Sequence, residues 1–304
     1  MSKIAFVFPG QGTQYVGMGK ELYENSEVAR KEFDELFSKL DFDLNKVMFE
    51  GPEEELKLTK NTQPAIVTMS LILTKLLENK GIKPEFVAGH SVGEYAAFGA
   101  AGYLSMEDAV KLTAARGKFM NEVAQKVNGG MAAIIGLEAD KIVEVLKNVD
   151  GVVEAVNFNE PKQTVIAGDK EAIERACVAL KEAGARRAMP LAVSGPFHSS
   201  LMKEAGEKLK EEANKYEFKM TDVKLIANTN AEILQNVDEI KEEIYRQSFG
   251  PVRWVDTINK LKAQGVTTIY EVGPGKVLAG LIKKIDKEIE VKNIEKLEDL
   301  ENLT

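Results

Sequence analysis

Hydrophobic and polar positions alternate along the first half of the chain between short apolar runs and longer stretches with helical spacing. The run from Ile4 to Phe8 is closed by a Pro-Gly pair, which predicts a strand. Residues 61–81 place apolar side chains at helical spacing between an early proline and a final glycine, which predicts a helix. A second apolar run, Phe86 to Ala88, predicts the next strand. This alternation indicates a mainly parallel sheet covered by helices.

The pattern changes between residues 128 and 197. It predicts a strand, a helix, two strands, a helix and a strand at 129–136, 137–148, 152–158, 163–169, 170–184 and 185–191. This βαββαβ order is typical of a ferredoxin-like unit. Strand and helix alternation then resumes, so we expect the unit to be an insert. The expected domains are a large one at 1–127 and 198–304 and a small one at 128–197, with a cleft between them as the natural place for a site.

Composition and charge limit the expected cellular compartment and the classes of ligand. No apolar run approaches the roughly 20 residues of a bilayer span, and the apolar start is too short for a signal peptide, so we expect a cytoplasmic protein without a membrane partner. A net charge of −8 argues against nucleic acid as the main partner. The chain has two histidines and one cysteine, which disfavours a metal site. That cysteine, Cys177, lies on the apolar stripe of a predicted helix, where we expect it in the core.

One short stretch carries a candidate nucleophile. Residues 89–93, Gly-His-Ser-Val-Gly, fit G-x-S-x-G between a predicted strand and an alanine-rich helix. In that context the serine, Ser91, occupies a strained turn that exposes its hydroxyl, while the amide of Val92 faces the same space. The alternative is a glycine-rich loop with an incidental serine. The strand, corner and helix around the motif favour the nucleophile.

A serine nucleophile needs a base, and the chain offers two histidines. His90 adjoins Ser91 on the tight turn, where neighbouring side chains diverge, so we expect it to pack beneath the turn. His198 follows the predicted insert and can meet Ser91 across the cleft, although alone it could be a residue at a helix start. No carboxylate is assigned as a third member, so the pattern fits a Ser-His dyad oriented by a backbone carbonyl.

Two further polar residues lie where chemistry is expected. Ser105 and Asp108 have capping-box spacing and predict a helix to about Val123, whose apolar stripe is interrupted by Arg116. That arginine either faces the cleft and binds a substrate carboxylate or forms an intramolecular ion pair. Gln11 lies on the loop after the first strand. The glycine spacing of this loop does not match a phosphate loop, which leaves Gln11 as a candidate amide donor to an oxyanion.

Several motifs together closely resemble one enzyme family. They are "FVFPGQGTQ", "TQPA", "GHSVGEYAA", "ARG" at 115–117, "GGMAAIIG", "FNEPKQTVIAG", "GPFHSSLM", "FGPVRW" and "YEVGPGKVL". Their set and order resemble the malonyl-CoA:acyl carrier protein transacylases of bacterial type II fatty-acid synthesis, over nearly the whole chain. The resemblance implies an α/β fold, with an α/β-hydrolase-like large domain containing a parallel sheet and an inserted ferredoxin-like small domain.

The resemblance also implies a role for each matching residue. The implied roles are nucleophile for Ser91, base for His198, malonyl carboxylate binding for Arg116, oxyanion hole for Gln11 and the Val92 amide, and orientation of the histidine region for Gln247. The implied reaction moves a malonyl group from malonyl-CoA to the phosphopantetheine thiol of acyl carrier protein through a serine-linked acyl-enzyme, without a cofactor.

Two other classes of function remain open from the residues alone. A serine esterase or a patatin-like lipase shares G-x-S-x-G, but the expected acidic third member is not evident. A non-enzymatic module that binds acyl carrier protein would lack the nucleophile, base or arginine. Candidate contacts for an acidic carrier protein are the basic residues Arg186, Arg187, Lys283, Lys284 and Lys287.

Overall fold

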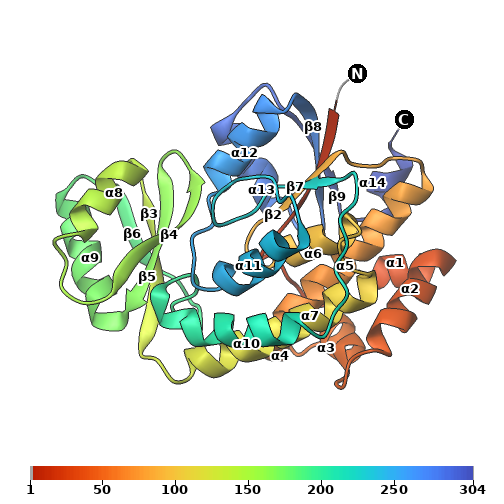
Figure 1. Cartoon of the computed structure of the whole chain (residues 1–304), viewed down its shortest axis with the longest axis horizontal. Helices are drawn as coiled ribbons and strands as arrows, with labels where there is room; N and C mark the ends of the chain where they lie inside the picture. Colours follow the sequence, from red (N-terminus) through yellow and green to blue (C-terminus); the bar gives the residue numbers. More distant parts are fainter. Residues whose placement is uncertain (1–2, 304) are drawn as a thin grey trace.

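The computed structural model describes residues 3–303, which form two β-sheets surrounded by helices (Figure 1). The elements are β1 (Lys3–Phe8), α1 (Lys20–Asn25), α2 (Glu27–Phe37), α3 (Leu44–Glu50), α4 (Glu53–Lys57), α5 (Thr59–Asn79), β2 (Phe86–Gly89), α6 (Gly93–Ala100), α7 (Met106–Ala124), β3 (Gly129–Ile135), α8 (Ala139–Leu146), β4 (Val153–Glu160), β5 (Gln163–Asp169), α9 (Lys170–Glu182), β6 (Arg187–Pro190), a 3₁₀ turn (Ser200–Met202), α10 (Lys203–Ala213), β7 (Lys224–Leu225), α11 (Val237–Gln247), α12 (Trp254–Ala263), β8 (Val266–Val272), α13 (Val277–Ile285), β9 (Glu290–Ile294) and α14 (Leu297–Glu301).

The first sheet has five parallel strands in the order β7-β2-β1-β8-β9. Alternate residues of β1 point to opposite faces: Ala5 and Val7 pack against α12 and α13, while Phe6 and Phe8 pack against the large helical layer that includes α5, α6 and α7. Both faces are therefore covered, which explains why these strands read as continuous apolar runs.

The second sheet has four antiparallel strands in the order β4-β5-β3-β6, which with α8 and α9 make the βαββαβ unit (Figure 1, left). One face packs against α8 and α9, and Cys177 is buried in this cluster as its apolar stripe predicts. A parallel sheet with a separate antiparallel unit confirms the expected fold class. The domain boundaries at 127/128 and 197/198 stay a prediction.

The other face of the antiparallel sheet packs against the large helical part. Met131 and Val165 from the sheet share a buried cluster with Met120 of α7, Phe197 and Met202. Backbone hydrogen bonds add to this contact, because the segment before α12 pairs with β4 through Val252. The two sheets are thus joined by a common hydrophobic cluster and a short backbone pairing.

Most predicted elements form close to their expected bounds. Ser105 begins α7 as predicted, its hydroxyl accepting the Asp108 N–H at 3.0 Å. Strand β7 is short, since it comprises only two residues. Among residues 3–303, no helix has both the length and the apolar character that a membrane crossing requires.

Candidate active site

The turn between β2 and α6 places Ser91 in an unusual backbone conformation. Its φ is 53°, in the left-handed region that non-glycine residues seldom occupy. The turn is possible because glycine lies on both sides: a Cβ on Gly89 would stand 1.9 Å from the Gly93 carbonyl carbon, and one on Gly93 would stand 2.1 Å from Phe8 O. Strand, sharp turn and helix thus meet in the arrangement that G-x-S-x-G predicts.

His198 meets this serine from 107 residues further along the chain. Its Nε2 lies 2.7 Å from Ser91 Oγ. Its Nδ1 lies 2.8 Å from the Gln247 carbonyl oxygen and 3.1 Å from that of Gly250. Since a carbonyl oxygen only accepts, Nδ1 carries the proton and Nε2 is left to accept from the serine hydroxyl. Burial, followed by the nearby Arg116 charge, lowers the pKa of His198 to about 3, so the ring is neutral at physiological pH.

Arg116 is fully buried on α7 and reaches the same serine. Its Nη2 donates to Ser91 Oγ at 3.4 Å, and its Nε and Nη2 donate to Gln247 Oε1 at 3.2 and 2.8 Å. The guanidinium lies over the Tyr95 ring, 5.2 Å from its centroid. Nη1 has no hydrogen-bond partner within the described chain, and no carboxylate there lies within ion-pair distance of Arg116. A buried cation with an unused donor beside a nucleophile is suited to binding an anionic substrate group.

Gln247 joins the arginine, the serine and the histidine. Its side-chain Nε2 donates to Ser91 O at 2.6 Å while Oε1 accepts from Arg116 and its backbone carbonyl accepts from His198. One residue at the end of α11 therefore contacts three of the predicted site residues.

Two candidate oxyanion donors lie near the nucleophile. The Val92 amide is at the start of α6 and makes no hydrogen bond to the described residues. Gln11 follows β1, and its side-chain Nε2 donates to Thr59 Oγ1 at 3.3 Å. Gln11 and Ser91 line the same cavity.

The other histidine, His90, contacts Asn159 Oδ1 at 2.7 Å and the Trp254 ring edge-on, which fits a packing role.

The cavity that contains Ser91 and His198 has a volume of about 540 Å³. Residues from both parts of the chain line it. Gln63 of α5 and Met120 of α7 form one side, and Met131, Asn157 and Leu191 of the antiparallel unit and the segment after it form the other. The site therefore opens into a cleft between the antiparallel unit and the helices around the parallel sheet.

Comparison with known proteins decides the family. The family model described as "Acyl transferase domain" matches residues 5–299. The chain belongs to the acyl transferase family. Malonyl CoA-acyl carrier protein transacylase of Bacillus subtilis (strain 168), a relative, is 49% identical over 292 residues, covering 95% of this chain and 92% of its own length.

Solved structures of acyl transferase family members have the same fold. An acyl carrier protein S-malonyltransferase from Vibrio cholerae superposes with a TM-score of 0.96 at 40% identity, with both chains covered in full. A malonyl-transacylase solved in complex with its type II PKS acyl-carrier protein gives a TM-score of 0.94 at 41% identity, with 98% of each chain covered.

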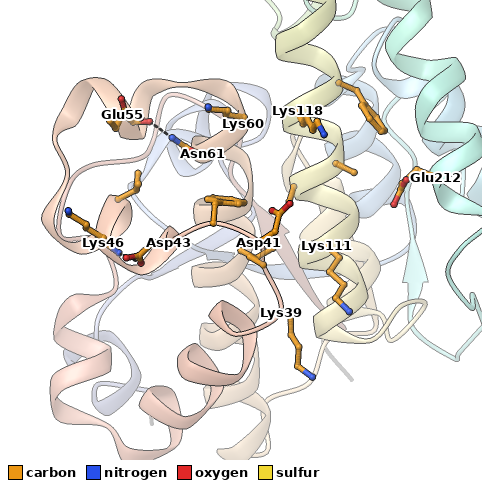
Figure 2. Close-up of a pocket in the computed structure, with 16 residues that line it drawn as sticks. Lys39, Asp41, Asp43, Lys46, Glu55, Lys60, Asn61, Lys111, Lys118 and Glu212 are labelled. Atoms are coloured by element: carbon orange, nitrogen blue, oxygen red, sulfur yellow. Dashed lines mark hydrogen bonds between the residues drawn. The ribbon is translucent and has the colours of Figure 1, made fainter.

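A larger hollow of about 880 Å³ lies elsewhere on this acyl transferase, between α3, α4, α5 and α7 (Figure 2). Neither Ser91 nor His198 lines it. Five lysines and four carboxylates do, so their charges nearly cancel. Size alone would point to this hollow, but the chemistry points to the cleft around Ser91.

One residue at the site was not predicted from the sequence. Asn228 is fully buried, and its side chain contacts the backbone on both sides of the turn at Ser91. A signal for it existed: it is a polar residue directly after an apolar run, and polar residues at the carboxyl ends of parallel strands form sites in α/β folds. That rule does not say which of the polar residues in "ANTN" faces inward.

Proposed function

We propose that this chain is a malonyltransferase of fatty-acid biosynthesis, which moves a malonyl group from coenzyme A to the phosphopantetheine thiol of acyl carrier protein. The observation that carries the proposal is the buried Arg116 guanidinium, 3.4 Å from a serine hydroxyl that is itself 2.7 Å from His198. A nucleophile and a base then line one cleft, and a buried cation for a carboxylate lies in contact with the nucleophile. The relatives' names supply the donor and the acceptor.

In the first half-reaction, Ser91 Oγ attacks the malonyl thioester carbonyl while His198 Nε2 takes its proton. The tetrahedral oxyanion receives hydrogen bonds from the Val92 amide and Gln11. The carbon–sulfur bond then breaks, and His198 returns the proton to the departing CoA sulfur. The product is a malonyl ester on Ser91, whose carboxylate is bound by Arg116.

In the second half-reaction, the phosphopantetheine thiol enters the same cleft. His198 takes the thiol proton as the sulfur attacks the ester carbonyl, and it returns that proton to Ser91 Oγ when the carbon–oxygen bond breaks. The two substrates thus use one site in turn, in a ping-pong sequence. We place this reaction in the cytoplasm.

Intact-mass spectrometry tests the proposal. Malonyl-CoA alone should add one malonyl group to the wild-type chain and none to Ser91→Ala. Added holo acyl carrier protein should then take up the malonyl mass while the enzyme loses it. His198→Ala should acylate about 10²-fold to 10⁴-fold more slowly, as expected when a general base is removed.

The same experiment separates the other classes of function. Release of free malonate without carrier protein would identify a hydrolase. A chain that binds carrier protein but never gains mass would be a binding module. Labelling that persists in Ser91→Ala would place the nucleophile at another residue.

A further inference from the structure

The parallel sheet stops short of the nucleophile on one side. Strand β7 pairs with β2 through a regular series in which the amide of Lys224 donates to Glu85 O at 3.0 Å and that of Ile226 donates to Val87 O at 3.1 Å. Each step advances both strands by two residues. The next bond of the series would leave the backbone two residues after Ile226 and end on the last carbonyl of β2.

That next bond exists, but a side chain makes it. Asn228 Nδ2 donates to Gly89 O at 2.6 Å, while its Oδ1 accepts the Ser91 N–H at 2.9 Å. One side-chain amide therefore supplies the donor and the acceptor that the backbone N–H and C=O of a single residue would supply in a continuing strand. Ser91 follows the end of β2 in a left-handed conformation, and its N–H is accepted by the Asn228 side chain in place of a backbone carbonyl.

We propose that Asn228 is a positioning residue for the nucleophile: its side-chain amide takes the place of one residue's backbone N–H and C=O in the parallel ladder and holds the strained turn so that Ser91 Oγ faces His198. The proposal rests on the proposed role of Ser91. It adds a second side-chain amide at the turn beside Gln247, whose Nε2 donates to Ser91 O at 2.6 Å and to Asn228 Oδ1 at 3.4 Å.

The backbone N–H and C=O of Asn228 are themselves held by hydrogen bonds. Its N–H donates to Glu94 Oε1 at 2.8 Å, and its carbonyl accepts the Arg253 N–H at 3.0 Å. The adjacent Thr229 donates its N–H, at 3.0 Å, and its hydroxyl to Glu243. Glu94 and Glu243 are both buried, and burial raises the pKa of each carboxyl. Two buried carboxyl groups are thus used to fix the segment that carries the amide.

Asparagine suits this position for a chemical reason. Gly89 O needs a donor and the Ser91 N–H needs an acceptor, and a primary amide presents one of each. An ionised carboxylate would accept from Ser91 but repel the carbonyl oxygen. A protonated carboxyl group would serve both partners.

Labelling by an alkyl fluorophosphonate tests the proposal without any malonyl substrate. Ser91 Oγ forms a bond to phosphorus, fluoride leaves, and His198 takes the serine proton. Asn228→Ala should lower the second-order labelling rate about 10²-fold, the size of loss expected when a nucleophile is displaced by about 1 Å. The matched control is Asn61→Ala, which removes a buried amide bonded to a backbone carbonyl at 2.8 Å outside the cleft and should label at the wild-type rate.

Asn228→Asp supplies a readout that a merely structural role would not give. Its carboxyl group would be buried opposite Gly89 O and near Glu94 of α6, Glu243 of α11, Arg116 of α7 and His198, and burial with two carboxyl neighbours raises its pKa. Its labelling rate relative to wild type should therefore rise as pH falls from 8 to 5, because protonation restores the missing donor. Asn228→Ala should show no such recovery.

Three results would overturn the proposal. One is labelling of folded Asn228→Ala, verified by circular dichroism, within threefold of the wild-type rate. Another is an equal loss in Asn61→Ala. The third is an Asn228→Asp rate whose ratio to wild type does not change with pH. Failure of malonyl transfer in the wild type would instead reject the proposed function and leave this result intact, since fluorophosphonate reports on the serine alone.

Discussion

At the scale of single residues, we expect Arg116 to discriminate between acyl groups. It is a buried cation with an unused donor, and the malonyl carboxylate is the group that distinguishes malonyl-CoA from acetyl-CoA. Removing one partner of a desolvated charge pair costs about 2–5 kcal/mol, so Arg116→Ala should lower malonyl transfer by roughly 30-fold to several thousand-fold. Acetyl transfer should change little or rise. The measurement is the ratio of the two kcat/KM values.

Arg116→Lys is the matched variant for this prediction. A lysine restores the charge but not the planar fork, so the malonyl preference should return in part. An alanine variant that folds and keeps the wild-type ratio would place the carboxylate contact elsewhere.

His198 should give the acylation step an unusual pH dependence. Burial and the Arg116 charge lower its pKa to about 3, so the neutral ring that accepts the serine proton predominates throughout pH 5–8. The rate at which malonyl-CoA acylates Ser91 should therefore stay level across this range. With an ordinary histidine, whose pKa is near 6.5, the acylation rate would fall about 30-fold at pH 5 because most rings would be protonated. Quenched-flow mass spectrometry measures the rate, and a fall centred near pH 6.5 would contradict the buried, neutral assignment.

At the scale of elements, the turn between β2 and α6 depends on two chain segments approaching closely. A Cβ on Gly93 would lie 2.1 Å from Phe8 O, so Gly93→Ala must push α6 away from β1. We expect it to lower the free energy of unfolding by at least the 1–3 kcal/mol typical of overpacking, and to slow acylation.

Gly280→Ala is the matched control within another helix. Gly280 lies exposed inside α13, where an added Cβ meets nothing within 4 Å. Because alanine is the better helix former, this variant should gain about 0.5–1 kcal/mol in the free energy of unfolding. Urea unfolding measures both variants, and equal shifts would show that the close approach at Gly93 does not limit stability.

At the scale of the whole molecule, a shared cluster should make the two sheets unfold together. Met202 is 0% exposed in the cluster between α7 and the antiparallel sheet. Met202→Ala should lower the free energy of unfolding by about 2–5 kcal/mol in a single transition. Met189→Ala, at a side chain that is 40% exposed, should have a far smaller effect.

Two probes can detect whether that transition is single. Trp254 fluorescence reports on α12, while far-ultraviolet circular dichroism reports on all helices. The two urea curves should coincide for the wild type and for Met202→Ala. Separate midpoints would mean that the cluster does not couple the sheets.

Features that depend on local pattern could be predicted from the sequence alone. Side-chain period separates strands from helices, and Gly89 and Gly93 flank Ser91 within five residues, so the turn and its nucleophile could be predicted. The βαββαβ order likewise follows from successive short segments. The quoted motifs then indicated the family and the roles of Arg116 and His198.

The contacts that hold the site became evident from the three-dimensional structure. The sequence left open whether Arg116 forms an ion pair or faces the nucleophile. In the structure, its side-chain partner is the amide of Gln247, 131 residues away in the chain, and not a carboxylate. Asn228 reaches Gly89 from 139 residues away. Such contacts join distant segments whose relative placement is set by the packing of whole sheets and helices. The local spacing of apolar residues therefore does not predict them. Local pattern therefore predicts which groups react, and packing decides which groups hold them.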